Sequence, residues 1–302
     1  MMQEQDRFGL EGRASFSDWL KSLPLYPLPQ HAISRLAHRF TRIENPRIRI
    51  PFTNWFIRRF GVSMRDAAEP DATTYAHFNA FFTRALKPGA RPLPEDPQAI
   101  CCPADGAISA FGRLDADRVL QAKGHDYSLT TLLGGDPARA RPFLDGCFMT
   151  VYLSPRDYHR VHMPADGRLL ETVHVPGRLF SVGRHTVRTI PNLFARNERL
   201  VCLFETAFGP MAVVLVGAIN VASIETVWAG EVTPPPARRI TVRSFDREAP
   251  RLLRGAELGR FNMGSTVIVV LPPGAANLDT SLLVDQAVRV GQAIGQQPVT
   301  GV

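Results

Sequence analysis

In the stretch RFNMGSTVIVVLPPG, residues 260–274, five consecutive apolar residues, Val267–Leu271, follow directly after Gly264, Ser265 and Thr266. A run this rich in valine and isoleucine predicts a buried strand. A turn before the strand would explain the glycine, but it would not explain the serine. The stretch therefore predicts a core strand close to the C-terminus and raises the question of what Ser265 does.

Short apolar runs of the same kind, separated by Gly, Pro and Asp, fill the chain from about residue 98 onward. Besides STVIVVLP (265–272), they include AISAFGRL (107–114), CFMTVYLS (147–154), RLLETVHV (168–175), RLVCLFET (199–206) and MAVVLVGAINVASIETVWAG (211–230). Their short spacing and their β-branched residues predict a mostly β domain. LLVDQAVRVGQAIG, residues 282–295, is interpreted as a terminal helix.

The N-terminal part of the chain has a different pattern. Residues 1 to about 30 contain three prolines near their end and are expected to be irregular. Apolar residues at helical spacing then predict helices within residues 31–43, 51–62 and 73–86. We therefore expect an α+β protein with a helical N-terminal region over residues 1–95 and a mostly β domain over residues 96–302.

The positive charge is concentrated in the predicted N-terminal helices. The 302-residue chain has a net charge of +7, and residues 31–60 contain seven arginines against one acidic residue, Glu44. Arginine beside Trp and Phe is typical of a helix that lies on an anionic membrane surface, although packing against a core is the alternative. We expect a membrane surface, and not nucleic acid, to contact Arg35, Arg39, Arg42, Trp55, Phe56, Arg58 and Arg59.

Two further patterns bear on the setting of the protein. The longest apolar run, Met211–Ile219, is too short to span a bilayer, and the first twenty residues carry no secretory signal, so a membrane-bound form would be peripheral. The four cysteines show no C-x-x-C spacing and are expected to be reduced core thiols in a cytosolic setting.

The densest polar cluster is SPRDYHRVHMPADG, residues 154–167, which contains Asp157, His159 and His162. A metal site is weakly supported, because no H-E-x-x-H pattern is present and Pro155 and Pro164 bracket the segment, so no metal is expected. Histidines that bond loop backbone groups are another interpretation. Proton transfer near neutral pH is the one that we favour for the whole cluster.

Asp105, in PADGAIS, and Ser265 would complete a Ser-His-Asp set with His162. Asp105 precedes a glycine and is equally explained as a turn residue. No G-x-S-x-G pattern surrounds Ser265, so a conventional hydrolase fits poorly. A Ser-His-Asp hydrolase and a non-enzymatic, membrane-surface scaffold both stay open on these residues alone.

Several segments taken together resemble one known family. FNMGST, YLSPRDYHRVHMP, PADGAIS, QAKGHDYSL, PNLFARNERLVCLFET and SIETVWAG look like the bacterial phosphatidylserine decarboxylase proenzymes, over about residues 50–285. Met263 stands where those bacterial proteins usually carry Leu, a change that preserves apolar volume.

The resemblance implies a self-processing enzyme. Cleavage between Gly264 and Ser265 would give a large chain (1–264) and a small chain (265–302) that stay associated, and Ser265 would become a covalent pyruvoyl cofactor. Asp105 and His162 match the other members of the self-cleavage triad. His159 matches a histidine that acts in decarboxylation, with Tyr158 or Asp157 in support, and Asp157 has no unique role.

The resemblance also implies the reaction. The pyruvoyl group would form a Schiff base with phosphatidylserine, and the products would be phosphatidylethanolamine and CO2, as a step of phospholipid biosynthesis. A carboxy-lyase of this kind would work as a peripheral protein at the cytoplasmic face of the cell membrane, and a homodimer would be compatible with it.

Overall fold

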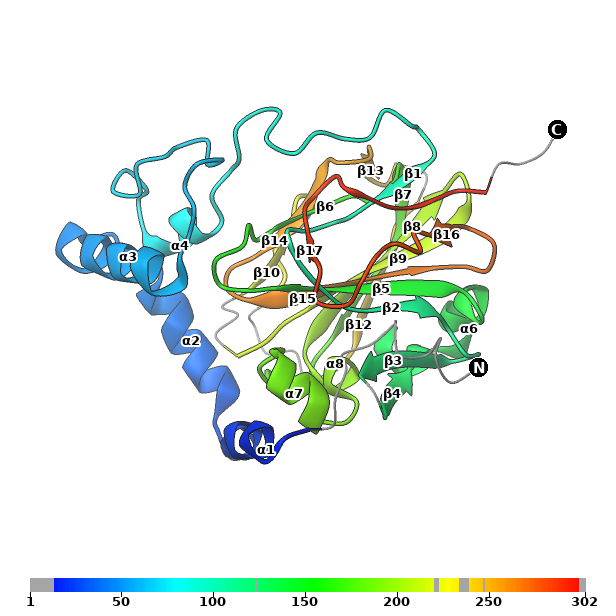
Figure 1. The fold of residues 1–302 in the computed structure, drawn as a ribbon, viewed down its shortest axis with the longest axis horizontal. Helices are drawn as coiled ribbons and strands as arrows, with labels where there is room; N and C mark the ends of the chain where they lie inside the picture. The colour runs from blue at the N-terminus through cyan, green and yellow to red at the C-terminus, as the bar shows by residue number, and fades with distance from the viewer. Residues whose placement is uncertain (1–13, 123, 220–222, 234–238, 247, 299–302) are drawn as a thin grey trace.

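The computed structural model describes residues 14–122, 124–219, 223–233, 239–246 and 248–298. Helices come first along the chain: α1 (Phe16–Ser22), a 3-10 turn η2 (Leu23–Leu25), α2 (Gln30–Phe40), α3 (Pro46–Phe60) and α4 (Phe78–Phe82). They lie along one side of the molecule, and the strands fill the rest of it (Figure 1). The expected mixture of helices and strands is confirmed.

The main sheet has the strand order β12-β7-β8-β9-β15-β5-β2-β17, and β13 also pairs with β7. All of its pairings are antiparallel. Its strands are β2 (Gly106–Arg113), β5 (Cys147–Leu153), β7 (Gly167–Val175), β8 (Arg199–Thr206), β9 (Gly209–Val216), β12 (Thr241–Ser244), β13 (Arg251–Leu252), β15 (Ser265–Leu271) and β17 (Ala287–Val288). Most of the apolar runs quoted above form these strands nearly residue for residue.

Three smaller sheets complete the β structure. One has the order β11-β10-β14-β6, one has β1-β18-β16, and β3 pairs with β4. Their bounds are β1 (Ala99–Cys101), β3 (Arg118–Ala122), β4 (His125–Ser128), β6 (Arg160–His162), β10 (Ile224–Thr226), β11 (Gly230–Glu231), β14 (Glu257–Phe261), β16 (Asn277–Leu278) and β18 (Ala293–Gln296). Short helical turns lie between the strands: α5 (Leu129–Leu132), α6 (Pro137–Ala140), η3 (Arg141–Phe143), α7 (Arg184–Thr189) and α8 (Leu193–Arg196).

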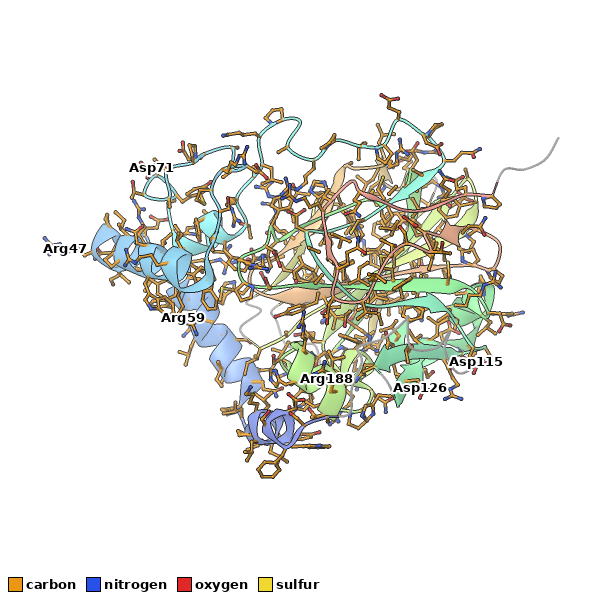
Figure 2. All side chains as sticks on the ribbon, in the orientation of Figure 1. Arg47, Arg59, Asp71, Asp115, Asp126 and Arg188 are labelled. Carbon is orange, nitrogen blue, oxygen red and sulfur yellow. The ribbon has the colours of Figure 1, made fainter. Side chains whose placement is uncertain are left out.

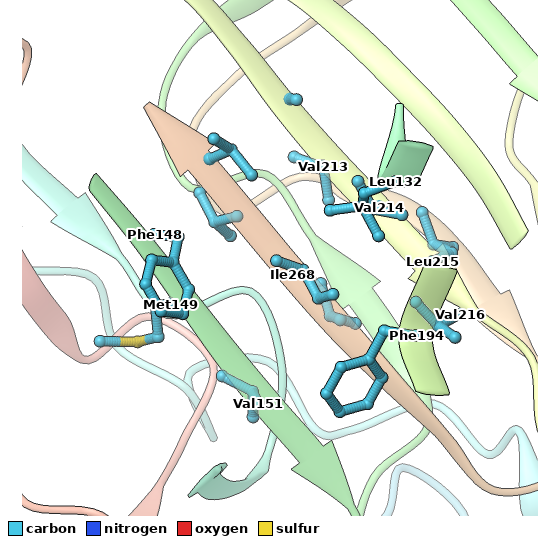
Figure 3. Packing of buried hydrophobic residues seen from close by; sticks show 14 of the residues in the cluster. Leu132, Phe148, Met149, Val151, Phe194, Val213, Val214, Leu215, Val216 and Ile268 are labelled. Carbon is cyan, nitrogen blue, oxygen red and sulfur yellow. The ribbon is translucent and has the colours of Figure 1, made fainter. Parts of the chain in front are cut away.

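Strand β15 occupies the centre of the main sheet. Every one of its residues is buried, and it pairs with β5 on one side and β9 on the other. Ile268 lies in the middle of the apolar side chains that β5 and β9 contribute (Figure 3). The strand that follows Ser265 is therefore held firmly at both edges, which fixes the position of Ser265 as its first residue.

Three expectations about helices are wrong. The supposedly irregular N-terminus contains α1, which begins directly after its N-cap, Ser15, because Ser15 and Asp18 form a reciprocal capping box. The helix expected over 73–86 is reduced to α4, since the hydroxyl of Tyr75 donates to the Glu69 carbonyl in a turn instead. The first 13 residues of the expected irregular segment lie outside the described residues.

The helix expected over 282–295 is replaced by turns and the strands β17 and β18. Asp285 and Gly291 have φ values of +67° and +82°, which interrupt a right-handed helix. Val288 instead pairs with Gly106 at the edge of the main sheet. Apolar spacing cannot tell a helix from short strands separated by such turns.

No helix within the described residues is long and apolar enough to cross a membrane. All four cysteines are buried and free of disulfides, as expected for core thiols. Burial raises the pKa of the Cys102 thiol to about 12 and that of the Cys147 thiol to about 11, so both thiols stay protonated and unreactive near neutral pH.

Candidate active site

The segment that leads into Ser265 is anchored at Asn262. The backbone N–H of Asn262 donates to the carbonyl of Ser223 at 2.9 Å, and its side-chain amide donates to the Ser223 hydroxyl. Its side-chain oxygen accepts a 2.9 Å hydrogen bond from Asn79 of α4. The chain is thus fixed directly before residues 263–264, while β15 fixes it directly after them.

Between these two anchors, Met263 has a φ of +136°. A side chain with a Cβ rarely adopts this conformation, and such residues concentrate at functional sites. Gly264 does not have a positive φ, and a Cβ added to it would meet no heavy atom within 4 Å. The strain therefore lies at Met263, and Gly264 has open space beside it.

Ser265 is completely buried, and its hydroxyl has no hydrogen-bond partner among the described residues. A buried, unbonded hydroxyl is unfavourable by about 1–3 kcal/mol. The residue lies opposite Leu153, the last residue of β5, so the loop that begins at Ser154 starts beside it. This loop carries His159.

His159 is also completely buried. Its Nδ1 lies 2.9 Å from the carbonyl of Asp157, and because a carbonyl only accepts, Nδ1 carries the proton. Its Nε2 consequently offers a lone pair, and it has no partner within the described residues. Burial lowers the pKa of His159 to about 3, and the Phe82 ring of α4 packs on the imidazole at 4.1 Å between centroids. His159 is a neutral side chain with one free nitrogen.

Asp157 shapes the loop that holds His159. One oxygen of its carboxylate accepts hydrogen bonds of 2.7 Å from both the backbone N–H and the hydroxyl of Ser154. Burial raises the pKa of Asp157. The carboxylate is therefore engaged with the start of its own loop, which gives Asp157 a local structural contact.

His162, in β6, has both ring nitrogens occupied. Nδ1 donates to the carbonyl of Gly255 at 2.7 Å, and Nε2 lies 3.0 Å from the hydroxyl of Tyr158, which donates to it. Burial lowers the pKa of His162, whereas burial raises the pKa of the Tyr158 hydroxyl to about 12. His162 is thus a neutral imidazole whose acceptor nitrogen is covered by Tyr158.

Asp105 does not hydrogen-bond His162. Its carboxylate accepts from Arg91 at 2.9 Å (Nε) and 2.5 Å (Nη2), and from the backbone N–H of Val290 at 2.9 Å. Arg91 also pairs with Asp66 at 2.9 Å. The expected carboxylate contact of His162 is made by the Gly255 carbonyl instead. The charge of Asp105 still acts on His162, where it raises the pKa against the larger effect of burial.

The strands nevertheless gather the expected residues at one end of the main sheet. Asp105 precedes β2, which pairs with β5, and β5 pairs with β15. Backbones two strands apart are separated by roughly 10 Å. The backbone N–H of His162 donates to the carbonyl of Pro103, which brings β6 beside the same end.

Within the described residues, no group of three or more His, Cys, Asp and Glu side chains could hold a metal ion. Sequence reasoning did not identify Arg91, Asn262 or Gly255, which position Asp105, residues 263–264 and His162 respectively. Asn262 lies in the quoted stretch FNMGST, but its role depends on contacts with Ser223 and Asn79, which the stretch does not reveal. Arg91 and Gly255 belong to no pattern that indicates chemistry.

Among the residues expected to meet a membrane, Phe56 is buried in the cluster that α3 and α4 form, so it cannot contact a surface. Arg42 is ion-paired with Glu231. Arg35, Arg39, Trp55, Arg58 and Arg59 are exposed, and Figure 2 shows Arg47 projecting outward from the N-terminal end of α3. The helices also expose large apolar side chains: Phe16, Trp19, Leu20, Leu23, Leu36, Phe40 and Ile48.

Comparison with known proteins identifies the family. A family model described as phosphatidylserine decarboxylase matches residues 78–296, most of the chain and all of the site residues above except Asp66. The chain belongs to the phosphatidylserine decarboxylase family. A second model, described as PSD, matches residues 20–61, which include α2 and α3. The family therefore extends over the helices as well as the β structure.

Individual relatives agree with this assignment over most of their length. A protein named phosphatidylserine decarboxylase proenzyme from Alkalilimnicola ehrlichii is 59% identical over 261 residues, which cover 86% of this chain and 91% of the relative. Proteins of the same name from Pseudomonas putida strain GB-1 and Marinobacter nauticus are 56% and 51% identical, and the matches cover 90% and 92% of this chain and 95% and 98% of theirs.

Proposed function

We propose that this chain is the precursor of an enzyme that decarboxylates phosphatidylserine to phosphatidylethanolamine and CO2 after cutting itself between Gly264 and Ser265. The observation that carries the proposal is the unbonded, buried hydroxyl of Ser265 next to the strained Met263. Membership of the family gives the reaction, and the relatives' name, proenzyme, is consistent with processing.

Self-cleavage begins with attack of the Ser265 hydroxyl oxygen on the Gly264 carbonyl. The C–N bond breaks, a C–O bond forms, and the hydroxyl proton passes to the released nitrogen, which gives an ester. Loss of the Cα proton of residue 265 then expels the Gly264 carboxylate and leaves dehydroalanine. Tautomerisation and hydrolysis convert it to a pyruvoyl group with release of ammonia. The new carboxylate of Gly264 keeps the serine oxygen.

His162 is the proposed base for the first step, because its Nε2 carries a lone pair. That nitrogen contacts the Tyr158 hydroxyl, so it must exchange this partner for Ser265. Asp105 is proposed to assist through its charge, since it makes no hydrogen bond to the imidazole. Its rigid attachment to Arg91 and Val290 keeps that charge in place.

The site fits a pyruvoyl group at residue 265. The buried hydroxyl has no competing partner, and space lies open beside Gly264. The group supplies a carbonyl that can condense with the substrate's amine and accept the electrons that remain when CO2 leaves. His159 is proposed to deliver the proton to carbon after CO2 departs. Its free Nε2 gains that proton only once the anionic substrate is bound, because a nearby anion raises the pKa that burial lowers.

The two chains are proposed to stay together after cleavage. Chain 265–302 begins with β15, which is paired along both edges in the centre of the sheet. We keep the division into a helical region, 1–95, and a catalytic domain, 96–302, as part of the proposal. A homodimer remains a prediction that a measurement of molar mass in solution would test.

A denaturing gel with intact-mass measurement separates this proposal from its rivals. Processing gives chains 1–264 and 265–302, the second with a blocked N-terminus, whereas a hydrolase or a scaffold gives one chain of 302 residues. Ser265→Ala and His162→Ala should remain uncut. His159→Ala should be cut but should release no CO2 from phosphatidylserine. Cleavage of Ser265→Ala would refute the assignment of the nucleophile.

The helices α1 to α3 are proposed to dock on the anionic, cytoplasmic face of the membrane. Their exposed apolar side chains and the exposed Arg35, Arg39, Arg58 and Arg59 support this. Flotation with vesicles that contain phosphatidylserine should be weakened by Arg35→Glu with Arg39→Glu. Arg243→Glu with Arg251→Glu, an equal charge change at exposed residues of β12 and β13, is the control. Equal loss in both variants would show only a general effect of charge.

A further inference from the structure

Arg84 is a buried cation that has no carboxylate partner within the described residues. Only 4% of the residue is exposed. Its guanidinium makes one long hydrogen bond, from Nη2 to the carbonyl of Arg156 at 3.4 Å, and lies 5.5 Å from the centre of the Phe81 ring. Its Nε is buried without a partner, and burial lowers the pKa of the group. A buried charge held this weakly opposes folding.

A second buried arginine shows how the same fold satisfies such a group. Arg199, 1% exposed, donates hydrogen bonds of 2.6–2.8 Å to the backbone carbonyls of Thr131, Leu132, Ala195 and Asn197. Arg199 thereby ties together the segments that pack on the main sheet. Arg84 makes no comparable set of contacts, so holding segments together does not explain its burial.

The position of Arg84 suggests an explanation. It follows α4 directly, and α4 contacts both halves of the candidate site: Phe82 packs on His159, and Asn79 bonds Asn262 before the scissile bond. The partner of its Nη2, Arg156, belongs to the loop that holds His159. The charge of Arg84 contributes to the lowered pKa of His159. The cation therefore lies close enough to act on the histidine.

The acidic groups that face Arg84 are already engaged elsewhere. Asp105 and Asp157 act on it through their charge, as Tyr75 and Tyr158 would if ionised, but neither carboxylate bonds it. Asp105 is held by Arg91, and Asp157 is held by Ser154. A guanidinium with free donors beside a reacting group is suited to an anionic ligand, which it can bind through two parallel hydrogen bonds.

We propose that Arg84 binds the phosphodiester of the substrate's headgroup and so positions the neighbouring serine moiety at residue 265 and His159. This inference rests on the proposed function. Phosphatidylserine offers two anions, and its carboxylate is the less suitable one, because a cation bound there would stabilise the charge that must leave as CO2. The phosphodiester persists in the product, so Arg84 assists binding without opposing the reaction.

The test compares Arg84→Met with Arg199→Met, two replacements of a buried arginine by the same apolar side chain. Arg84→Met should still cleave itself and should melt at the same temperature as the unchanged protein or above it. Its KM for dihexanoylphosphatidylserine and its Kd for dihexanoylphosphatidylethanolamine should each rise about tenfold to a hundredfold. Arg199→Met should melt at a lower temperature, because it loses its carbonyl contacts.

Three outcomes would overturn the proposal. Unchanged KM and Kd would show that Arg84 contacts no part of the ligand. A higher KM with unchanged binding of dihexanoylphosphatidylethanolamine would assign the carboxylate as its partner. A lower kcat with a shifted pH profile and an unchanged KM would mean that Arg84 acts only through His159. If Arg84→Met fails to fold, Arg84→Lys, which keeps the charge without the planar fork, supplies the same measurements.

Failure of the proposed function would look different. If the unchanged protein releases no CO2, the Kd for dihexanoylphosphatidylethanolamine still reports whether Arg84 binds a phosphodiester. Dihexanoylglycerol, which has the acyl chains without the phosphate, is the matched ligand. Its binding should be the same in the unchanged protein and in Arg84→Met.

Discussion

The conformation of Met263 predicts that Gly should be more stabilising than Ala at this position, which is the reverse of the usual order. At most positions Gly is less stabilising than Ala by about 0.5–1 kcal/mol, because it loses more backbone freedom on folding. At a φ of +136°, Ala keeps the strain of about 1–3 kcal/mol, while Gly releases it. Both replacements lose the same packing of a half-buried methionine against the helical cluster. We therefore expect Met263→Gly to be more stable than Met263→Ala by about 1 kcal/mol.

The comparison is made in the Ser265→Ala background, so that only uncut chain is present. Urea unfolding of the two variants gives the difference in the free energy of unfolding. Leu253, an exposed residue without a positive φ, is the control: there Gly should be less stable than Ala. If Met263→Gly is no more stable than Met263→Ala while Leu253 behaves normally, the residue is not strained.

Met263→Gly and Met263→Ala also test whether the strain at Met263 accelerates self-cleavage. If cleavage relieves the strain at Met263, a stabilisation of about 1 kcal/mol in the uncut chain raises the barrier by the same amount. With Ser265 intact, Met263→Gly should then cut itself about fivefold more slowly than Met263→Ala. Equal rates would mean that the strain persists into the transition state and does not assist the reaction.

Further predictions concern His159, Ile268 and Gly264, which surround the bond between Gly264 and Ser265. The pKa of His159 is 6.5 in the unfolded chain and about 3 in the folded one, so below pH 6.5 the unfolded chain binds more protons than the folded chain. The free energy of unfolding should therefore decrease by up to about 1.4 kcal/mol for each unit by which the pH is lowered below 6.5. Urea unfolding of uncut protein at pH 7, 6 and 5 should show that the free energy of unfolding decreases less with falling pH in His159→Gln than in the parent. An equal dependence on pH in the two proteins would contradict the lowered pKa of His159. Ile268→Ala should cost about 2–5 kcal/mol, measured in the same way, since Ile268 is fully buried in the central strand; a smaller loss would mean that the core closes around the gap. Gly264→Ala should unfold within about 1 kcal/mol of the parent, because its methyl group meets open space, yet it should cut itself more slowly, as seen on a gel, because that group crowds attack on the carbonyl. Normal cleavage would show that the glycine is dispensable.

The strands were predictable because their signals are local. Runs such as STVIVVLP and RLVCLFET contain enough β-branched residues to form strands in many settings, and both appear where expected, as β15 and β8. The failures share a cause. The segment 282–295 has helical spacing, but the positive φ at Asp285 and Gly291 and the pairing of Val288 with Gly106 depend on partners far along the chain.

For the candidate site, the sequence identified the residues but not their hydrogen-bond partners. Ser265, His159, His162 and Asp105 were identifiable because they belong to short motifs. Their contacts were not identifiable. The carboxylate of Asp105 lies with Arg91, and the imidazole of His162 lies between Tyr158 and Gly255. A motif gives the residue types that a reaction needs, whereas hydrogen-bond partners are set by the tertiary packing.

Several unfavourable features of the fold involve the candidate active site and the α4 segment that packs on it. The hydroxyl of Ser265, the Nε2 of His159 and the Nε of Arg84 are all buried and have no hydrogen-bond partner in the described parts of the chain, and Met263 is strained. Each such feature opposes folding by about 1–3 kcal/mol, so together they are comparable to the whole stability of an ordinary domain. They persist because β15 is paired along both edges and Asn262 is bonded on both sides. Weakening either anchor should therefore disorder the site before it unfolds the sheet.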